Sequence, residues 1–101
     1  MPLAIAVDRG RIEEFCRKWK VAELSLFGSA LGEDFGPESD VDVLVELGED
    51  APWDAFDWVD MIEDLKGIFG RDIDLVEKTA IRNPFRRHHI LSHREVIYAA
   101  R

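Results

Sequence analysis

The sequence has few of the features that crosslink a chain or anchor it in a membrane. Cysteine occurs once in 101 residues, as Cys16, so no internal disulfide can form. No apolar run approaches the roughly 20 residues that a membrane-spanning helix needs. The stretch 1–8 is too short for the apolar part of a secretory signal. We therefore expect a cytoplasmic protein with no membrane partner.

Positive charge is also scarce. The chain has 13 basic and 21 acidic residues, which gives a formal net charge of -8. A protein that binds nucleic acid needs a basic face to neutralise the phosphates. Direct nucleic-acid binding is therefore not expected, and the charge instead suits cations or a basic partner.

The length fits one domain over residues 1–101, and the chain contains no repeats. With 47% hydrophobic residues it can form a core, although a small one. A domain of this size buries only about 60–70% of the surface that its unfolded chain exposes. A partner, or self-association into a homo-oligomer, would add to its stability.

The hydrophobic periodicity predicts helices that alternate with strands. Ile12, Phe15, Cys16 and Trp19 form one apolar stripe, which places the cysteine in the core. We expect helices at about 8–20, 53–68 and 84–100, strands at 23–27, 40–47 and 72–77, a helical turn at 29–34 and a turn at 36–39. This order predicts an α/β fold with helices packed on a small sheet. The pattern leaves open whether all the strands are parallel.

Aspartates lie within two of the predicted strands, where this residue is disfavoured. Asp40 and Asp42 share one strand face about 6.5 Å apart, while the intervening valines share the other. Two carboxylates so placed favour a hard dication between them. If the strands at 40–47 and 72–77 are neighbours, Asp74 joins the same site. Taken alone, the motif also fits a turn cap at Asp40 and a polar strand face at Asp42.

A glycine and a serine end the first predicted strand. Gly28 permits a sharp turn and close approach of a ligand, and Ser29 opens a helical turn. Backbone N–H groups and a hydroxyl at such a turn can hold phosphate. Ten residues separate Ser29 from Asp40, and the combination predicts a site for triphosphate and metal together.

The two-part motif resembles the minimal nucleotidyltransferases of the DNA polymerase beta-like superfamily. Their pattern is Gly-Ser, a ten-residue gap and Asp-x-Asp, matched here by Gly28-Ser29 and Asp40-Val41-Asp42. The strand 73–76 and the segment 84–91 also look familial. The resemblance implies a small mixed β-sheet flanked by helices, as in other nucleotidyltransferases.

The resemblance also implies a role for each matching residue. Gly28 and Ser29 would bind the triphosphate of ATP, and Asp40 and Asp42 would bind Mg²⁺. Asp74 would complete the metal site and assist deprotonation of the acceptor. Family members are often antitoxins whose partner is a HEPN-domain toxin, and active members transfer AMP from ATP to a tyrosine of that toxin.

This chain departs from the family pattern in its cations. Relatives often carry an arginine soon after the Gly-Ser pair and another before the turn proline, whereas this chain has Ala30 and Gly36 there. Two functions therefore stay open. The first is a Mg²⁺-dependent protein adenylyltransferase, and the second is a non-catalytic antitoxin or nucleotide-binding subunit that acts by binding its partner.

The three histidines form no metal-binding pattern. His88 and His89 are adjacent and His93 follows, without the spacing of a known metal motif. We expect these side chains on a solvated or partner-facing helix surface.

Overall fold

The computed structural model describes residues 6–31, 36, 39–49 and 51–100. Its centre is a four-stranded sheet in the order β3-β2-β1-β4. The helices are α1 (Arg9–Lys18), α2 (Ala55–Phe69) and α3 (Pro84–Ser92); the strands are β1 (Val21–Phe27), β2 (Val41–Leu47), β3 (Ile73–Glu77) and β4 (Arg94–Ala99). Strand β2 runs parallel to β3, while β1 is antiparallel to both β2 and β4. The sheet is therefore mixed, and the predicted fold class is confirmed.

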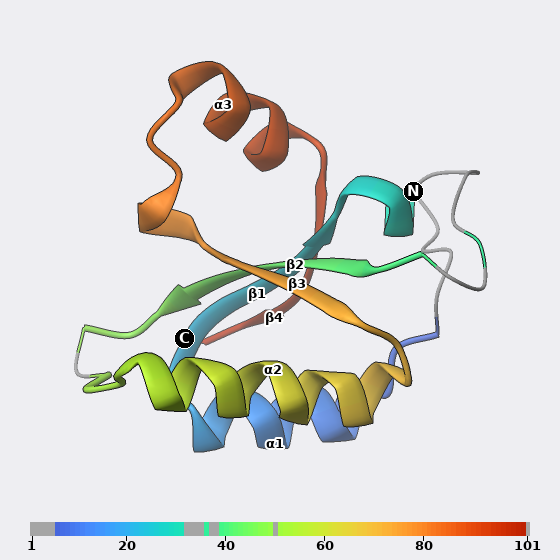
Figure 1. Cartoon of the computed structure of the whole chain (residues 1–101), viewed down its shortest axis with the longest axis vertical. Coiled ribbons are helices and arrows are strands. Elements are labelled where there is room, and N and C mark those ends of the chain that lie inside the picture. Colours follow the sequence, from blue (N-terminus) through green and yellow to red (C-terminus); the bar gives the residue numbers. More distant parts are fainter. Residues whose placement is uncertain (1–5, 32–35, 37–38, 50, 101) are drawn as a thin grey trace.

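Helices α1 and α2 cover one face of the sheet (Figure 1). The alternating valines of β2 point to this face and are fully buried, together with Ile12 of α1 and Met61 and Leu65 of α2. Cys16 is part of the same core, as its position in the apolar stripe predicts. Burial raises the pKa of the Cys16 thiol to about 12 because the thiolate would lose its hydration.

Local sequence signals set the helix boundaries. Asp54 and Asp57 form a reciprocal capping box at the start of α2, and Gly70 ends the helix with φ 68°. Asn83 caps α3 and Pro84 takes its first turn, as predicted. Helix α1 ends two residues before the predicted boundary at Lys20, whose φ of 55° is not helical.

The predicted single helix over 84–100 is wrong beyond Ser92. The segment Arg94–Ala99 is strand β4, which pairs antiparallel with β1. Its residues include Val96, Ile97 and Tyr98, which suit a pleated, half-buried surface. Pairing along β1 gives that strand a neighbour on both sides, so its backbone groups are satisfied away from water.

Helix α3 lies over the other face of the sheet, opposite α1 and α2 (Figure 1). It packs there through a second, smaller core cluster formed by Phe27, Leu44, Ile81 and Ile90. Within the described ranges, no helix combines the length and apolar character needed to cross a membrane.

The segment between β1 and β2 carries the predicted motif residues. A short 3₁₀ helix, η1 (Gly28–Leu31), stands where a helical turn over 29–34 is predicted, and residues 32–34 lie outside the described ranges. The predicted turn at 36–39 is described at its two ends, where the Ser39 N–H donates to the Gly36 carbonyl over 3.1 Å. Its residues 37 and 38 lie outside the description.

Candidate active site

Two of the predicted aspartates are direct neighbours in the sheet. Asp42 of β2 and Asp74 of β3 are partners in the parallel register, about 4.8 Å apart at the backbone. Since Val41 and Val43 point into the α1–α2 core, Asp42 points to the opposite face. Asp42 is half-buried, while Asp74 is exposed.

Asp40 directly precedes β2 at the same end of the sheet. The Val41 N–H donates to the Asp72 carbonyl over 2.9 Å, so the start of β2 is bound to the segment that leads into β3. Asp40 is exposed and lies just ahead of the strand, two residues before Asp42. The sheet thus brings Asp42 and Asp74 together, and Asp40 adjoins them in the chain at the same end of the sheet.

Gly28 meets Asp42 at the end of β1. Its φ is +66°, and a Cβ built at this position would lie 2.2 Å from Asp42 Oδ2. Phe27, the preceding residue, is the register partner of Asp42. Only a glycine allows both this backbone conformation and this approach of the carboxylate. The predicted juxtaposition of the Gly-Ser turn and the Asp-x-Asp strand is therefore present in the fold.

An arginine outside the predicted motifs holds the turn before Asp40. Nη1 of Arg71 donates to the carbonyl of Gly36 over 2.7 Å and to that of Ser39 over 3.0 Å. The Gly36 N–H donates to Ser39 Oγ over 2.9 Å. Arg71 stands just before β3, so it connects this turn to the strand that carries Asp74. Sequence reasoning missed this role because its partners are backbone carbonyls, which leave no sequence pattern.

The donors at this end of the sheet are all carboxylate oxygens, the ligands that Mg²⁺ prefers. Across the part of the chain that the structure describes, no three side chains of Asp, Glu, His or Cys form a preassembled metal-binding group. Mg²⁺ usually takes one or two carboxylates and fills its other positions with water and substrate phosphates. The pair Asp42 and Asp74, with Asp40 beside them, fits that mode of binding.

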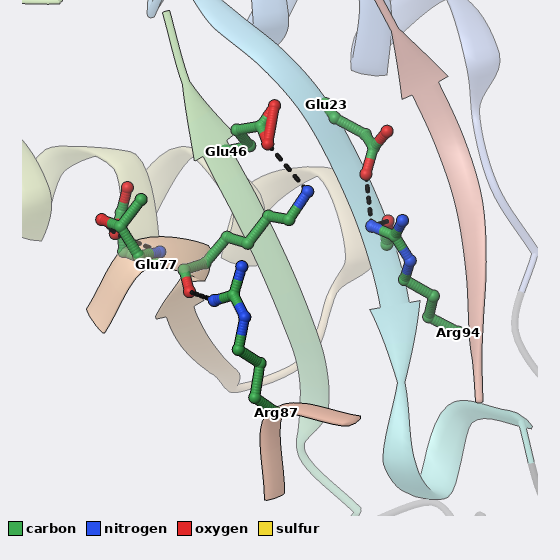
Figure 2. A network of polar contacts seen from close by, with 8 residues as sticks. Glu23, Glu46, Glu77, Arg87 and Arg94 are labelled. Carbon is green, nitrogen blue, oxygen red and sulfur yellow. Dashed lines mark hydrogen bonds and ion pairs between the residues drawn. The ribbon is translucent and has the colours of Figure 1, made fainter. Parts of the chain in front are cut away.

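A network of charged side chains occupies the other end of the same face (Figure 2). Glu23 and Glu46 are opposite each other in the β1–β2 register, and like charges so placed destabilise a sheet. Each has its own cation: Arg94 pairs with Glu23, and Lys78 Nζ lies 2.8 Å from Glu46 Oε1. Arg87 of α3 then donates to the Lys78 carbonyl over 2.7 Å. This network fixes the far end of the face and the approach to α3.

A cavity of about 620 Å³ lies between η1, α3 and the start of β4. Its lining includes Phe27, Gly28, Leu31, Arg86, His89 and His93. All three histidines are exposed, as expected, but only His89 and His93 line this cavity. Their side chains therefore lie near the glycine of the predicted motif, which the sequence pattern did not indicate.

Known proteins resemble this chain in sequence and in fold. Residues 9–97 match the sequence model of the family described as nucleotidyltransferase domain. A Methanocaldococcus jannaschii protein, provisionally named a protein adenylyltransferase, is 37% identical over 68 residues, covering 67% of this chain and 68% of that protein.

Two solved structures show a similar fold. One is a toxin–antitoxin complex with AMP-PNP, with a TM-score of 0.73, 18% identity and coverage of 94% of this chain and 76% of that one. The other is a tri-AMPylated Shewanella oneidensis HEPN toxin in complex with its MNT antitoxin, with a TM-score of 0.64, 17% identity and coverage of 91% and 70%.

Proposed function

Because this chain belongs to the nucleotidyltransferase family, we propose that it transfers AMP from ATP to a tyrosine hydroxyl of a HEPN-type toxin and thereby acts as the antitoxin. The observation that carries the proposal is the contact of Gly28 with Asp42, which brings the glycine turn and the strand carboxylates into one site. The relative with an adenylyltransferase name and the AMPylated toxin complex support the acceptor class.

Each site residue has a role in this proposal. Gly28 and Ser29 bind the triphosphate, and Asp40, Asp42 and Asp74 hold Mg²⁺. The metal supplies neutralisation of phosphate charge during the displacement. Asp74 is exposed, so an acceptor hydroxyl can approach its carboxylate, which in this proposal takes the proton.

The reaction is an in-line displacement at phosphorus. The acceptor oxygen forms a bond to the α-phosphorus of ATP, and the bond from that phosphorus to the bridging oxygen of the β-phosphate breaks. Pyrophosphate leaves with the bonding electron pair, and the hydroxyl proton passes to the Asp74 carboxylate. The products are AMP-tyrosine and pyrophosphate.

A specific observation also favours a second function. Ala30 and Gly36 occupy the places where relatives often carry arginines, so this chain has fewer cations to hold a triphosphate. The second candidate is an antitoxin that neutralises its partner by binding alone.

Intact-mass spectrometry distinguishes the two functions. The chain is incubated with ATP, Mg²⁺ and a purified HEPN-type toxin with which it forms a complex. Transfer adds the mass of one or more AMP groups to that partner, and omission of Mg²⁺ abolishes the addition. Asp74→Asn keeps the shape of the side chain and should slow transfer at least about 100-fold, the scale of a lost general base, while complex formation persists.

The matched control is Asp60→Asn, the same change at an exposed position on α2, on the other side of the sheet. It should leave transfer unchanged. If the unmodified chain forms the complex and suppresses toxicity without any mass change, the binding-only function is the correct one.

A further inference from the structure

The cavity beside Gly28 gives the proposed active site a second compartment. We infer that it binds the base and ribose of the nucleotide, and that the carboxylate end of the sheet binds only the phosphates and the acceptor. This inference rests on the proposed function, since it concerns how the same nucleotide is held. Its volume of about 620 Å³ lies within the range of roughly 300–1,000 Å³ that small-molecule sites occupy.

Gly28 connects the two compartments. It lines the cavity, and its Cα also lies against the Asp42 carboxylate. A ligand in the cavity that extends past Gly28 therefore reaches the aspartates without crossing a side chain at that position. A nucleoside triphosphate has this two-part shape, with a flat base at one end and an anionic chain at the other.

The walls of the cavity suit a flat heterocycle. Phe27 and Leu31 provide apolar surface on the sheet side. On the α3 side, the rings of His89 and His93 are stacked with centroids 4.4 Å apart and planes 25° apart. The His93 Nδ1 atom lies 2.8 Å from the His89 carbonyl, which fixes the orientation of the pair. Bases stack on aromatic side chains, and each such contact contributes about 1–3 kcal/mol.

The lining contains charged side chains of both signs, since Glu95 lines the cavity together with Arg86 and Arg94. Arg94 lines the cavity, but its guanidinium is paired with Glu23 and lies 3.4 Å from Ser25 Oγ. Its charge is therefore compensated within the protein. Arg86 is exposed on α3 and forms no ion pair with any described residue, so it is available to the ribose or its ester oxygen.

Binding measurements with two ligands test this division. Calorimetry in Mn²⁺ compares ATP with inorganic tripolyphosphate, which has the same anionic chain and no nucleoside. His89→Ala should weaken ATP binding about tenfold and leave tripolyphosphate binding unchanged, because only the stacking surface is lost. His93→Ala, from the other ring of the pair, should have the same selective effect.

The matched control is His88→Ala, which removes an exposed imidazole from the adjacent position of α3 that does not line the cavity. It should change neither affinity. If His89→Ala weakens both ligands equally, the cavity contacts phosphate and the inference is wrong. If it weakens neither, the cavity does not hold the nucleoside and the inference is also wrong. Failure of the unmodified chain to bind either ligand would instead overturn the proposed function itself.

Discussion

At the scale of single residues, the site requires that residue 28 has no Cβ atom. Gly28 combines a left-handed backbone with a carboxylate packed against its Cα, and these are separate constraints. The left-handed backbone conformation strains any L-residue at this position, at a cost of about 1–2 kcal/mol. The second acts on Asp42, because a methyl group at position 28 would force that carboxylate to move.

The two constraints can be separated because a second glycine shares only the first. Gly70 has φ +68°, yet a Cβ at that position meets nothing within 4 Å. Gly70→Ala should therefore lower the free energy of unfolding by about 1–2 kcal/mol without changing ATP binding. Gly28→Ala should lower it further and abolish detectable Mn²⁺-dependent ATP binding. Urea unfolding and calorimetry measure the two effects, and equal ATP binding by both variants would contradict this account of Gly28.

Cys16 gives a prediction about pH. Its pKa is raised from 9.0 to about 12 by burial, so between these values the unfolded chain has lost the thiol proton while the folded chain keeps it. The unfolded state then binds fewer protons, and stability falls as the pH rises, by up to about 1.4 kcal/mol per pH unit. Below pH 9 this contribution is constant.

The measurement is urea unfolding from pH 8.5 to pH 11, compared with Cys16→Ala. The variant loses packing at every pH, but its unfolding free energy should not fall with pH on account of a thiol. The difference in unfolding free energy between the two proteins should therefore narrow as the pH rises. A constant difference would show that the thiol titrates normally in the folded chain.

At the scale of elements, the parts that could be predicted are those with two agreeing local signals. Strand β2 has an apolar alternation and a polar pair out of phase with it, so both its existence and its buried face follow from its own residues. Helix α3 has its cap at Asn83 and its proline at Pro84, and its start is correctly predicted.

Strand β4 has one local signal, the β-branched and aromatic residues Val96, Ile97 and Tyr98, and no second signal that agrees with it. The segment forms a strand by pairing with the edge of β1. This pairing is long-range, since the register partner of Phe27 is Arg94. The strand order and the cavity under α3 depend on the same long-range pairing, and no local pattern contains it. The proximity of Asp42 and Asp74 could be predicted because it requires only that the two strands that carry them are neighbours.

The turn before Asp40 is held from another element, which makes Arg71 a positioning residue. Arg71→Met removes its donors to the carbonyls of Gly36 and Ser39 and should destabilise the protein by about 1–3 kcal/mol. It should also weaken Mn²⁺-dependent ATP binding, because Asp40 follows this turn directly. Arg71→Lys keeps a donor and should restore part of the affinity.

Arg9→Met is the matched control, since Nη1 of Arg9 donates to the Ile97 carbonyl over 3.1 Å, away from the turn. It should lower stability as measured by thermal unfolding without affecting nucleotide affinity. If Arg71→Met leaves ATP binding intact despite a similar loss of stability, its role is structural only.

At the scale of the whole molecule, the two faces of the sheet differ in what covers them. The face under α1 and α2 is closed by the main core, while the other carries the aspartates, the cavity and the charged network (Figure 1). Helix α3 covers only part of this second face. The main core and the proposed site thus lie on opposite faces, and the second, smaller core cluster shares the face of the proposed site.

The net charge of -8 also acts on the whole molecule. ATP is itself strongly anionic, so its approach to an acidic protein is opposed at long range. Mg²⁺ on the nucleotide reduces this repulsion, and a basic partner surface would reduce it further. A bound Mg²⁺ and a basic partner, as in the proposed function, would therefore offset the negative charge of the chain.

The pairing of β4 with β1 has a consequence for the order of events during synthesis. Strand β1 emerges from the ribosome before β4, and the edge that β4 covers stays unpaired until residues 94–99 have been made. Through that interval the nascent chain exposes a strand edge rich in apolar residues, which is a template for association with other chains. Translation speed and chaperone access before the arrival of β4 should then influence the yield of folded protein.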